Sequence, residues 1–160
     1  MRALHHLGAG NLSLNLYLDT SVISAYFDVR RPERQGETQA FWKKLPDFHV
    51  SISDLTESEL RAISDEQLRQ KILELAQPFG IIRLDEEMRE LDKYYLDRGI
   101  FPPAAVNDAL HVACAVVIRQ DLLVSWNFRH LVNRRRRAMI NQENLSRGYP
   151  TIEIVAPPEV

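Results

Sequence analysis

Cysteine, net charge and long apolar runs are all scarce in this sequence. Its single cysteine, Cys114, excludes an intramolecular disulfide and any zinc site built from two or four cysteines. A lone thiol suits the reducing cytoplasm, and we expect Cys114 to lie in the core. Twenty-two acidic and twenty basic residues give a formal net charge of −2, which excludes a histone-like basic surface over the whole protein.

Signals for membrane insertion and export are also missing. No apolar run approaches the roughly 20 residues that span a bilayer, and residues 1–12 lack the apolar core of a signal peptide. Regular apolar patterning begins only at Leu14, so we interpret residues 1–12 as a loose N-terminal extension, with no metal role for its adjacent His5 and His6. Residues 13–160 are then expected to form one domain, since their length is typical of one.

Short apolar runs alternate with segments of helical spacing. Runs typical of buried strands occupy residues 14–18, 48–52, 80–84 and 122–125, and an edge-like strand is expected at 151–155. Helices are expected after Thr20, over 37–45, after an N-cap at Ser53, after a capping box at 64–67, after Asp85 and over 106–118. Strands separated by such helices form βαβ units. The expected fold class is therefore α/β with a central, mainly parallel sheet.

The common catalytic signatures do not occur. The sequence contains no GxGxxG, GxxxxGK[ST], GxSxG or HExxH motif, which excludes the usual dinucleotide, P-loop, α/β-hydrolase and zinc-protease sites. A phosphatase of the Asp-x-Asp type would need a second carboxylate at position 21, where Ser21 stands.

Acidic and amide side chains at the ends of the predicted elements remain as candidates. Asp19 directly follows the first strand, and Asn127 comes just after the strand at 122–125. Ligands of open parallel sheets bind beyond the carboxyl ends of the strands, where both residues are expected. Glu59 lies in the helix after the second strand, and Asp108 lies early in the apolar helix at 106–118.

Asp108 is the most informative of these candidates, because its surroundings, AAVNDALHVACAVV, are almost entirely apolar. A carboxylate that is buried without a partner is costly, so Asp108 needs a partner or a metal ion. Carboxylates that converge on one spot repel each other unless a cation neutralises them, and hard oxygen ligands select Mg²⁺ or Mn²⁺. Such an ion can orient an attack on a phosphodiester.

Each candidate also has an ordinary structural interpretation. Asp19 can serve as a helix N-cap, and Asp108 can interact with the dipole of its own helix. Glu59, with Glu57 on a different face, can be a solvated helix residue. His111 is three residues after Asp108 and is expected to be a hydrogen-bonded structural histidine rather than a ligand.

Four segments, taken in order, resemble the motifs of PIN-domain nucleases, and among these the VapC-type toxins of prokaryotic toxin–antitoxin systems. They are LYLDTSVISAYFD, SISDLTESELRAI, VNDALHVACAVV and LLVSWNFRHLVN. The resemblance runs from about Leu14 to Asn133, and the final GYPTIEIVAPPEV is similar as well. It implies a PIN-like three-layer α/β/α fold and a Mg²⁺- or Mn²⁺-dependent endoribonuclease. It also implies an RNA substrate, a homodimer and a cognate antitoxin that blocks the acidic groove.

The resemblance assigns roles to the candidates. Asp19, Glu59 and Asp108 match the metal-binding acidic positions, and no nucleophilic side chain is required. The fourth acidic position falls on Asn127, where an amide keeps an oxygen ligand but removes one negative charge. This exchange leaves the number of bound metals open. It also keeps open a second function, a catalytically weak PIN module that binds RNA or a protein partner; a small metal-dependent phosphatase is a third.

Hydroxyl and basic residues accompany the acidic positions. Ser21 and Ser125 match hydroxyl positions beside the aspartates and would orient ligands or waters. Arg129 and the arginine run at 134–137 can hold RNA phosphates, with an affinity that falls as salt rises; the alternative for the run is a solvated helix start. Trp126 can stack on a base or pack in the core.

Overall fold

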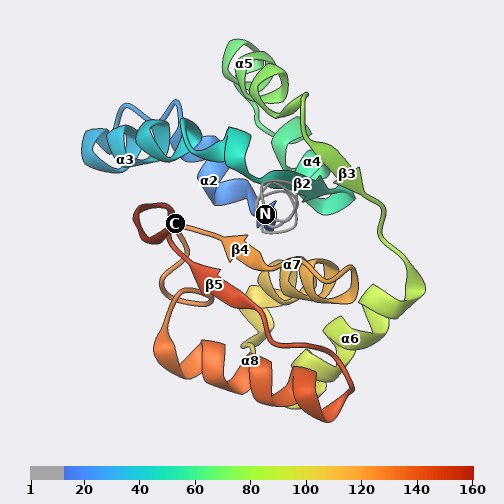
Figure 1. Ribbon diagram of the computed structural model, residues 1–160. Coiled ribbons are helices and arrows are strands. Elements are labelled where there is room, and N and C mark those ends of the chain that lie inside the picture. The colour runs from blue at the N-terminus through green and yellow to red at the C-terminus, as the bar shows by residue number, and fades with distance from the viewer. Residues whose placement is uncertain (1–12) are drawn as a thin grey trace, which may run out of the picture.

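The computed structural model describes residues 13–160 and shows one five-stranded parallel sheet between two layers of helices (Figure 1). The expected extension at residues 1–12, with His5 and His6, lies outside the described residues. The strands are β1 (Asn15–Leu18), β2 (His49–Ser53), β3 (Gly80–Ile82), β4 (Leu122–Val124) and β5 (Glu153–Val155). Their order is β3-β2-β1-β4-β5, so the last strand is an edge strand as expected. All four pairings are parallel, which confirms the α/β class.

Seven α-helices connect these strands within residues 13–160. They are α2 (Thr20–Ala25), α3 (Pro32–Trp42), α4 (Asp54–Arg61), α5 (Glu66–Ala76), α6 (Glu86–Asp97), α7 (Val106–Val117) and α8 (Arg134–Ser146). Three short 3-10 turns are η1 (Leu45–Asp47), η2 (Pro103–Ala105) and η3 (Pro157–Glu159). Helices α2–α5 cover one side of the sheet and α6–α8 cover the other (Figure 1). This division follows from the strand order, because right-handed crossovers that run in opposite directions place their helices on opposite faces.

The helix starts follow from short polar side chains that accept the first free backbone N–H groups. Asp19, Ser53, Asp85 and Asn133 accept from the third residue of α2, α4, α6 and α8. The capping box expected at 64–67 is wrong in detail, because Asp65 provides the cap of α5 and accepts from the amide of Leu68 at 3.0 Å.

Helix α3 begins five residues before the expected start at 37. Pro32 occupies its first turn, where the missing N–H costs nothing and the fixed backbone angle favours a helix. The polar residues that follow Pro32 gave no apolar periodicity, so the pattern concealed this turn.

The core lies around the two central strands and α7. Leu16, Leu18 and Leu123 are fully buried, and α7 is buried from residue 109 to residue 116. Cys114 lies in this buried stretch, which confirms its expected place.

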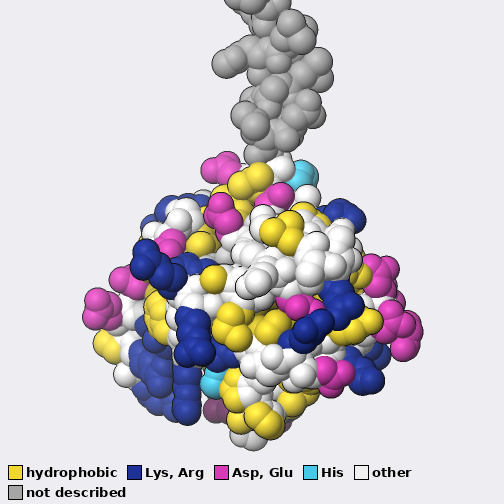
Figure 2. All heavy atoms as spheres, turned by 90° about the horizontal axis from the view of Figure 1, so that it is seen from below, with side chains coloured by type: hydrophobic (Ala, Val, Ile, Leu, Met, Phe, Trp, Pro, Cys, Tyr) yellow, Lys and Arg dark blue, Asp and Glu magenta, His cyan; other side chains and the backbone are white. Residues whose placement is uncertain are grey.

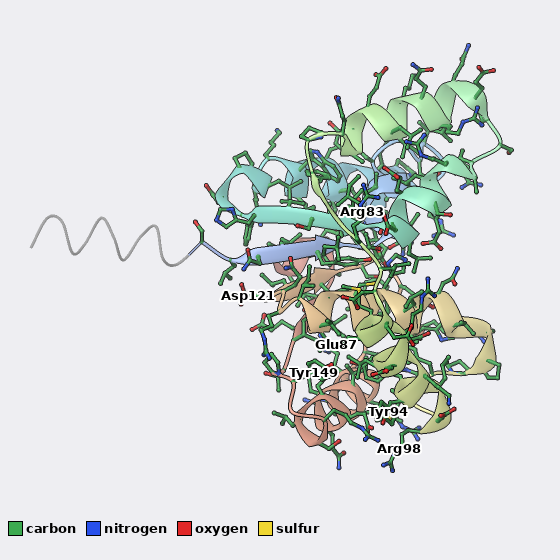
Figure 3. All side chains as sticks on the ribbon, turned by 90° about the vertical axis from the view of Figure 1, so that its right-hand side faces the viewer. Arg83, Glu87, Tyr94, Arg98, Asp121 and Tyr149 are labelled. Atoms are coloured by element: carbon green, nitrogen blue, oxygen red, sulfur yellow. The ribbon has the colours of Figure 1, made fainter. Side chains whose placement is uncertain are left out.

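Side-chain contacts connect β1 with the residue before β4 at the amino ends of these strands, and others hold the chain at the end of α8 against α6. The Asp121 carboxylate accepts from the backbone N–H of Asn15 at 2.8 Å. The Tyr149 hydroxyl donates to Glu87 on α6 at 2.6 Å, and the Arg147 guanidinium lies 3.5 Å from the ring centre of Tyr94. Figure 3 shows Glu87, Tyr94 and Tyr149 near one another below the sheet, whereas Asp121 lies at its left-hand end.

Candidate active site

The direction of the chain connections reverses between β1 and β4. From β1 the chain proceeds through β2 to β3, and it then returns to β4 on the other side of β1. In open α/β sheets, ligands bind at such a reversal, beyond the carboxyl ends of the strands. Leu18 pairs with Val124 in the parallel register, so Asp19 and Ser125 are the first residues beyond this point.

Asp19 is buried at this point, with both carboxylate oxygens occupied. Ser21 Oγ donates to Oδ1 at 2.5 Å, Ser125 Oγ donates to Oδ2, and the Val22 amide donates to Oδ1 as the helix cap. Only 4% of Asp19 is exposed, and burial raises its pKa despite these donors. The interpretation of Asp19 as the N-cap of α2 is thus confirmed. The same carboxylate is also costly to ionise, because it is buried.

Two backbone amides fix the hydroxyls that hold Asp19. The N–H of Trp126 donates to Ser21 Oγ, and the N–H of Asn127 donates to Ser125 Oγ, both at 2.9 Å. Each hydroxyl therefore accepts from the loop after β4 and donates to the carboxylate at the end of β1. This arrangement joins the two strands at the site.

Asp108 and Asn127 meet beside Asp19. The Asn127 amide nitrogen donates to Asp108 Oδ2 at 3.1 Å, while its oxygen accepts from the His130 N–H at 2.9 Å. Burial and the negative charge of Asp19 raise the pKa of Asp108. Asp108, whose ionisation is opposed both by burial and by the nearby Asp19 carboxylate, forms with Asp19 a donor set suited to a hard divalent cation. The first turn of α7 holds Asp108, so the helix dipole also acts on it.

Glu59 lies to one side of this pair. Its Oε1 accepts from Thr20 Oγ1 and from His111 Nε2, both at 2.7 Å, and Oε2 accepts from the Asn107 amide at 3.4 Å. Burial opposes the charge of Glu59, but these hydrogen bonds outweigh it and hold its pKa below the ordinary value. Within residues 13–160, no three His, Cys, Asp or Glu side chains are grouped closely enough for one ion. The structure thus unites Asp19 with Asp108 and holds Glu59 separately.

Sequence reasoning missed His130, three residues after Asn127. Its Nδ1 is buried with no hydrogen-bond partner among the described residues, and its positive form lowers the pKa of Asp108. The signal available was its spacing: the turn in which Leu131 donates to the Asn127 carbonyl brings residues 127–131 together. Thr20 and Asn107, which contact Glu59, were also missed, although each directly precedes or follows a predicted acidic residue.

A family model for the PIN domain matches residues 16–131. The chain belongs to the PIN domain family. The matched segment contains Asp19, Glu59, Asp108 and Asn127. PIN domains are generally nucleases that use divalent metal ions, and the Asp19–Asp108 pair fits such an ion.

Two solved structures share the fold. The VapC20 toxin of Mycobacterium tuberculosis, which cleaves the sarcin–ricin loop, aligns with a TM-score of 0.57 at 16% identity, over 72% of this chain and 92% of its own. VapBC2 of Rickettsia felis, bound to a DNA fragment from its promoter, aligns with a TM-score of 0.54 at 14% identity, over 89% of this chain and 98% of its own. No curated protein matches the sequence. These likenesses confirm the PIN-like three-layer fold.

Basic side chains of this PIN domain gather around the start of α8. Figure 2, which views the molecule from the α8 side, shows a dense Lys and Arg patch at the lower left. A hollow of about 460 Å³ beside the start of α8 is lined by Gly99, Pro102, Arg129, Asn133, Arg135, Arg136 and Met139. The run at 134–137 is divided: Arg134 and Arg135 are exposed, whereas Arg137 donates to the Ile154 carbonyl at 3.0 Å. The interpretation as a wholly solvated helix start is therefore wrong for part of the run.

Trp126 packs in the core instead of facing the solvent. Only 7% of it is exposed, its Nε1 donates to Thr38 Oγ1 at 2.9 Å, and the Arg34 guanidinium lies 4.9 Å from its ring centre. The neighbouring Phe128 is 48% exposed. The core interpretation of Trp126 is confirmed.

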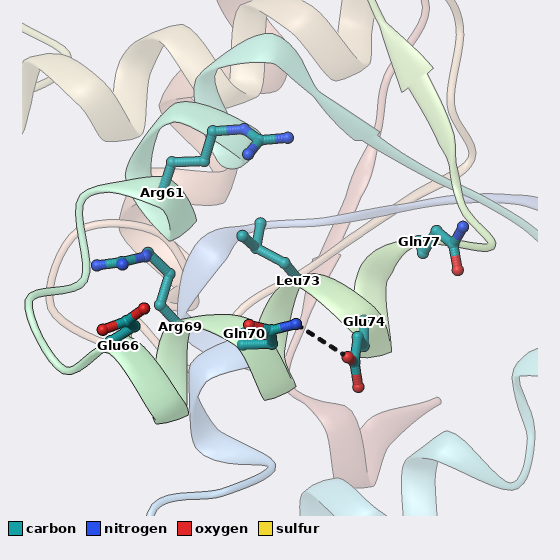
Figure 4. A pocket seen from close by; sticks show the side chains of 7 residues that line it. All are labelled: Arg61, Glu66, Arg69, Gln70, Leu73, Glu74 and Gln77. Carbon is teal, nitrogen blue, oxygen red and sulfur yellow. Dashed lines mark hydrogen bonds between the residues drawn. The ribbon is translucent and has the colours of Figure 1, made fainter.

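A second hollow lies along α5, away from these residues (Figure 4). It has a volume of about 490 Å³, and its walls include Arg61, Arg69, Leu73 and Glu74. The Gln70 amide donates to Glu74 at 3.5 Å. None of the predicted site residues lines this hollow. No helix within the described residues is long and apolar enough to cross a membrane.

Proposed function

We propose that this PIN domain is a metal-dependent endoribonuclease that hydrolyses RNA phosphodiester bonds and acts as the toxin of a VapBC-type toxin–antitoxin pair. The observation that carries the proposal is the pairing of the buried Asp19 with the half-buried Asp108 at the reversal between β1 and β4. Asp19 and Asp108, with Glu59 as the third acid, would hold Mg²⁺ or Mn²⁺. When bound, such an ion activates water and polarises the scissile phosphate.

The remaining residues position the acids and the substrate. Ser21 and Ser125 hold both oxygens of Asp19, and Asn127 orients the Asp108 carboxylate through its amide nitrogen. Arg129 is exposed and lines the basic hollow, where it would bind an RNA phosphate. Cys114 is buried in α7, so its thiol takes no part.

The same proposal includes the partners. VapBC2 of Rickettsia felis is a toxin–antitoxin complex, and by analogy we expect a cognate antitoxin that covers the acidic groove of this chain. We also expect a homodimer in the cytoplasm, a compartment that suits the single cysteine.

A catalytically weak PIN module that binds RNA or a partner is the second candidate, and Asn127 favours it. The amide already donates to Asp108, so the pair is partly neutralised without an ion. Metal affinity distinguishes the two functions, because a binding module has no need for Mg²⁺ at millimolar concentration.

The test is cleavage of a labelled total-RNA pool by the purified, antitoxin-free protein with Mn²⁺, with Mg²⁺ and with chelator. An Asp108→Asn variant purified in the same way controls for contaminating ribonuclease. Cleavage that requires both the metal and Asp108 supports the nuclease. Cleavage that is equal in the variant, or absent from the metal-loaded wild type, contradicts it and favours the binding module.

A further inference from the structure

A chain of hydrogen bonds runs from the buried Tyr17 through His111 to Oε1 of Glu59. The Tyr17 hydroxyl on β1 lies 2.5 Å from His111 Nδ1 on α7, and His111 Nε2 lies 2.7 Å from Glu59 Oε1 on α4. Tyr17 is fully buried and His111 is 3% exposed, whereas the Glu59 side chain is 31% exposed. Strand β1 is therefore linked through His111 of α7 to one carboxylate oxygen on α4.

For a neutral His111 ring, the contacts on its two nitrogens fix the position of each proton. An ionised Glu59 only accepts hydrogen bonds, so His111 Nε2 must carry the proton that points at it. In the neutral ring, Nδ1 is then an acceptor, and the Tyr17 hydroxyl must donate to it. Burial raises the pKa of Tyr17 well above its ordinary value, so this phenol keeps its proton.

The oxygen of Tyr17 is supported in turn by two hydroxyls. Ser53 Oγ lies 2.8 Å from it and Thr56 Oγ1 lies 3.3 Å from it; Ser53 is the N-cap of α4, and Thr56 lies within α4, the helix that also carries Glu59. With the Tyr17 proton committed to His111, these hydroxyls are the donors. Both ends of the chain are thus anchored on α4, with β1 and α7 between them.

We propose that Tyr17 and His111 are positioning residues, which lock Oε1 of Glu59 and leave Oε2 available to a divalent cation. This inference rests on the proposed function in one respect, in that it takes Glu59 as part of the metal site. Oε1 is occupied by His111 and Thr20 at 2.7 Å, whereas the contact of Oε2 with Asn107 at 3.4 Å is long. Groups that orient a ligand through hydrogen bonds tune metal affinity without touching the metal.

The experiment is a calorimetric titration of the full chain with Mn²⁺ alone. His111→Leu removes the donor to Glu59, and we expect it to lower Mn²⁺ affinity about 10-fold. His111→Gln places an amide N–H toward Glu59, and we expect it to recover most of that loss. In a Glu59→Gln background, His111→Leu should change the affinity no further.

Tyr95→Phe controls for the loss of a buried hydrogen bond elsewhere in the core, because the fully buried Tyr95 hydroxyl donates to Asn144, far from Glu59 in the sequence. We expect this variant to bind Mn²⁺ as the wild type does. A second measurement needs no substitution: long-range proton–nitrogen correlation spectra of the wild type should show His111 with Nε2 protonated and Nδ1 free.

The results separate this inference from the proposed function. Wild-type affinity in His111→Leu, a Mn²⁺ affinity that does not depend on Glu59, no measurable Mn²⁺ binding at all, or a protonated Nδ1 would each overturn the inference. The expected affinities together with an absence of RNA cleavage would support the positioning chain and refute the nuclease.

Discussion

Asp92 on α6 offers a stability prediction that is independent of the site. Its Oδ1 is buried with no hydrogen-bond partner among the described residues, and burial raises its pKa to about 6 although Arg89 opposes this. A rise from 3.8 to about 6 corresponds to about 3 kcal/mol against the ionised form. Because the side chain is only half-buried, solvent screening reduces the cost to about 1–2 kcal/mol.

The pH dependence follows from the sign of this change. Above pH 6, Asp92 is ionised in both the folded and unfolded states, so the folded protein bears the full cost. As the pH falls below 6, the folded state takes up a proton before the unfolded state does, and stability increases until about pH 4. The destabilisation by Asp92 is therefore a property of neutral and alkaline solutions.

Asp92→Asn keeps the shape and removes the charge. We expect the variant to be about 1–2 kcal/mol more stable than the wild type at pH 7.5, with a Tm higher by roughly 2–8 °C. Thermal unfolding followed by circular dichroism at pH 7.5 and pH 4 measures this, and the difference should be much smaller at pH 4. Glu90→Gln, an exposed change on the same helix, is the control. A gain in Asp92→Asn that is absent at pH 7.5, or that is equal at both pH values, would refute the reasoning.

Three further predictions concern the site and the core. Ser125→Ala removes the donor to Asp19 Oδ2, and we expect about a 10-fold loss of Mn²⁺ affinity by calorimetry; unchanged affinity would contradict the role of the hydroxyl. Tyr95→Phe leaves the buried Asn144 oxygen without its donor, so chemical denaturation should show a loss of about 1–3 kcal/mol. Arg129→Ala should weaken RNA binding and reduce its salt dependence by about one phosphate contact, measured as the slope of log affinity against log salt; an unchanged slope would exclude the contact.

The sequence was sufficient to predict the strands and most of the helices, because the signals for them are local. Apolar runs and capping side chains lie within a few residues of the elements they define, as Asp85 does for α6. The predictions of the starts of α5 and α3 were wrong because the local signals there were ambiguous or weak. Ser64 and Asp65 are both capping residues, and only the backbone angles of the folded chain select Asp65. At Pro32, a start signal preceded a polar stretch with no apolar face to reveal a helix.

The site was predictable only in part, for the same physical reason. Asp19 and Asn127 follow strands, so the edge of the sheet at which they lie could be inferred from the fold class. The partners of Glu59 could not be inferred, because His111 and Thr20 come from other elements and meet it only in three dimensions. His111 was correctly expected to be hydrogen-bonded, but a spacing cannot show which groups it joins.

Asn127 is the residue at which stability and metal binding oppose each other. Its amide nitrogen donates to Asp108, whose ionised form is disfavoured by the nearby Asp19 carboxylate. In the metal-free protein, this hydrogen bond therefore stabilises the Asp108 carboxylate. In Asn127→Asp this donor becomes a third carboxylate, so we expect the metal-free protein to lose roughly 1.5–3 kcal/mol at pH 7.5.

The same change should increase the affinity for Mn²⁺, because a further negative charge favours a divalent cation. Binding to the folded state alone raises stability in proportion to the logarithm of ligand concentration over Kd. The Tm of Asn127→Asp should therefore start below that of the wild type in chelator and rise more steeply with added Mn²⁺. Identical Tm values in chelator and parallel responses to Mn²⁺ would contradict this argument. They would show that the side chain at position 127 does not interact electrostatically with Asp19 and Asp108, so that the charge at this position has no effect on metal binding.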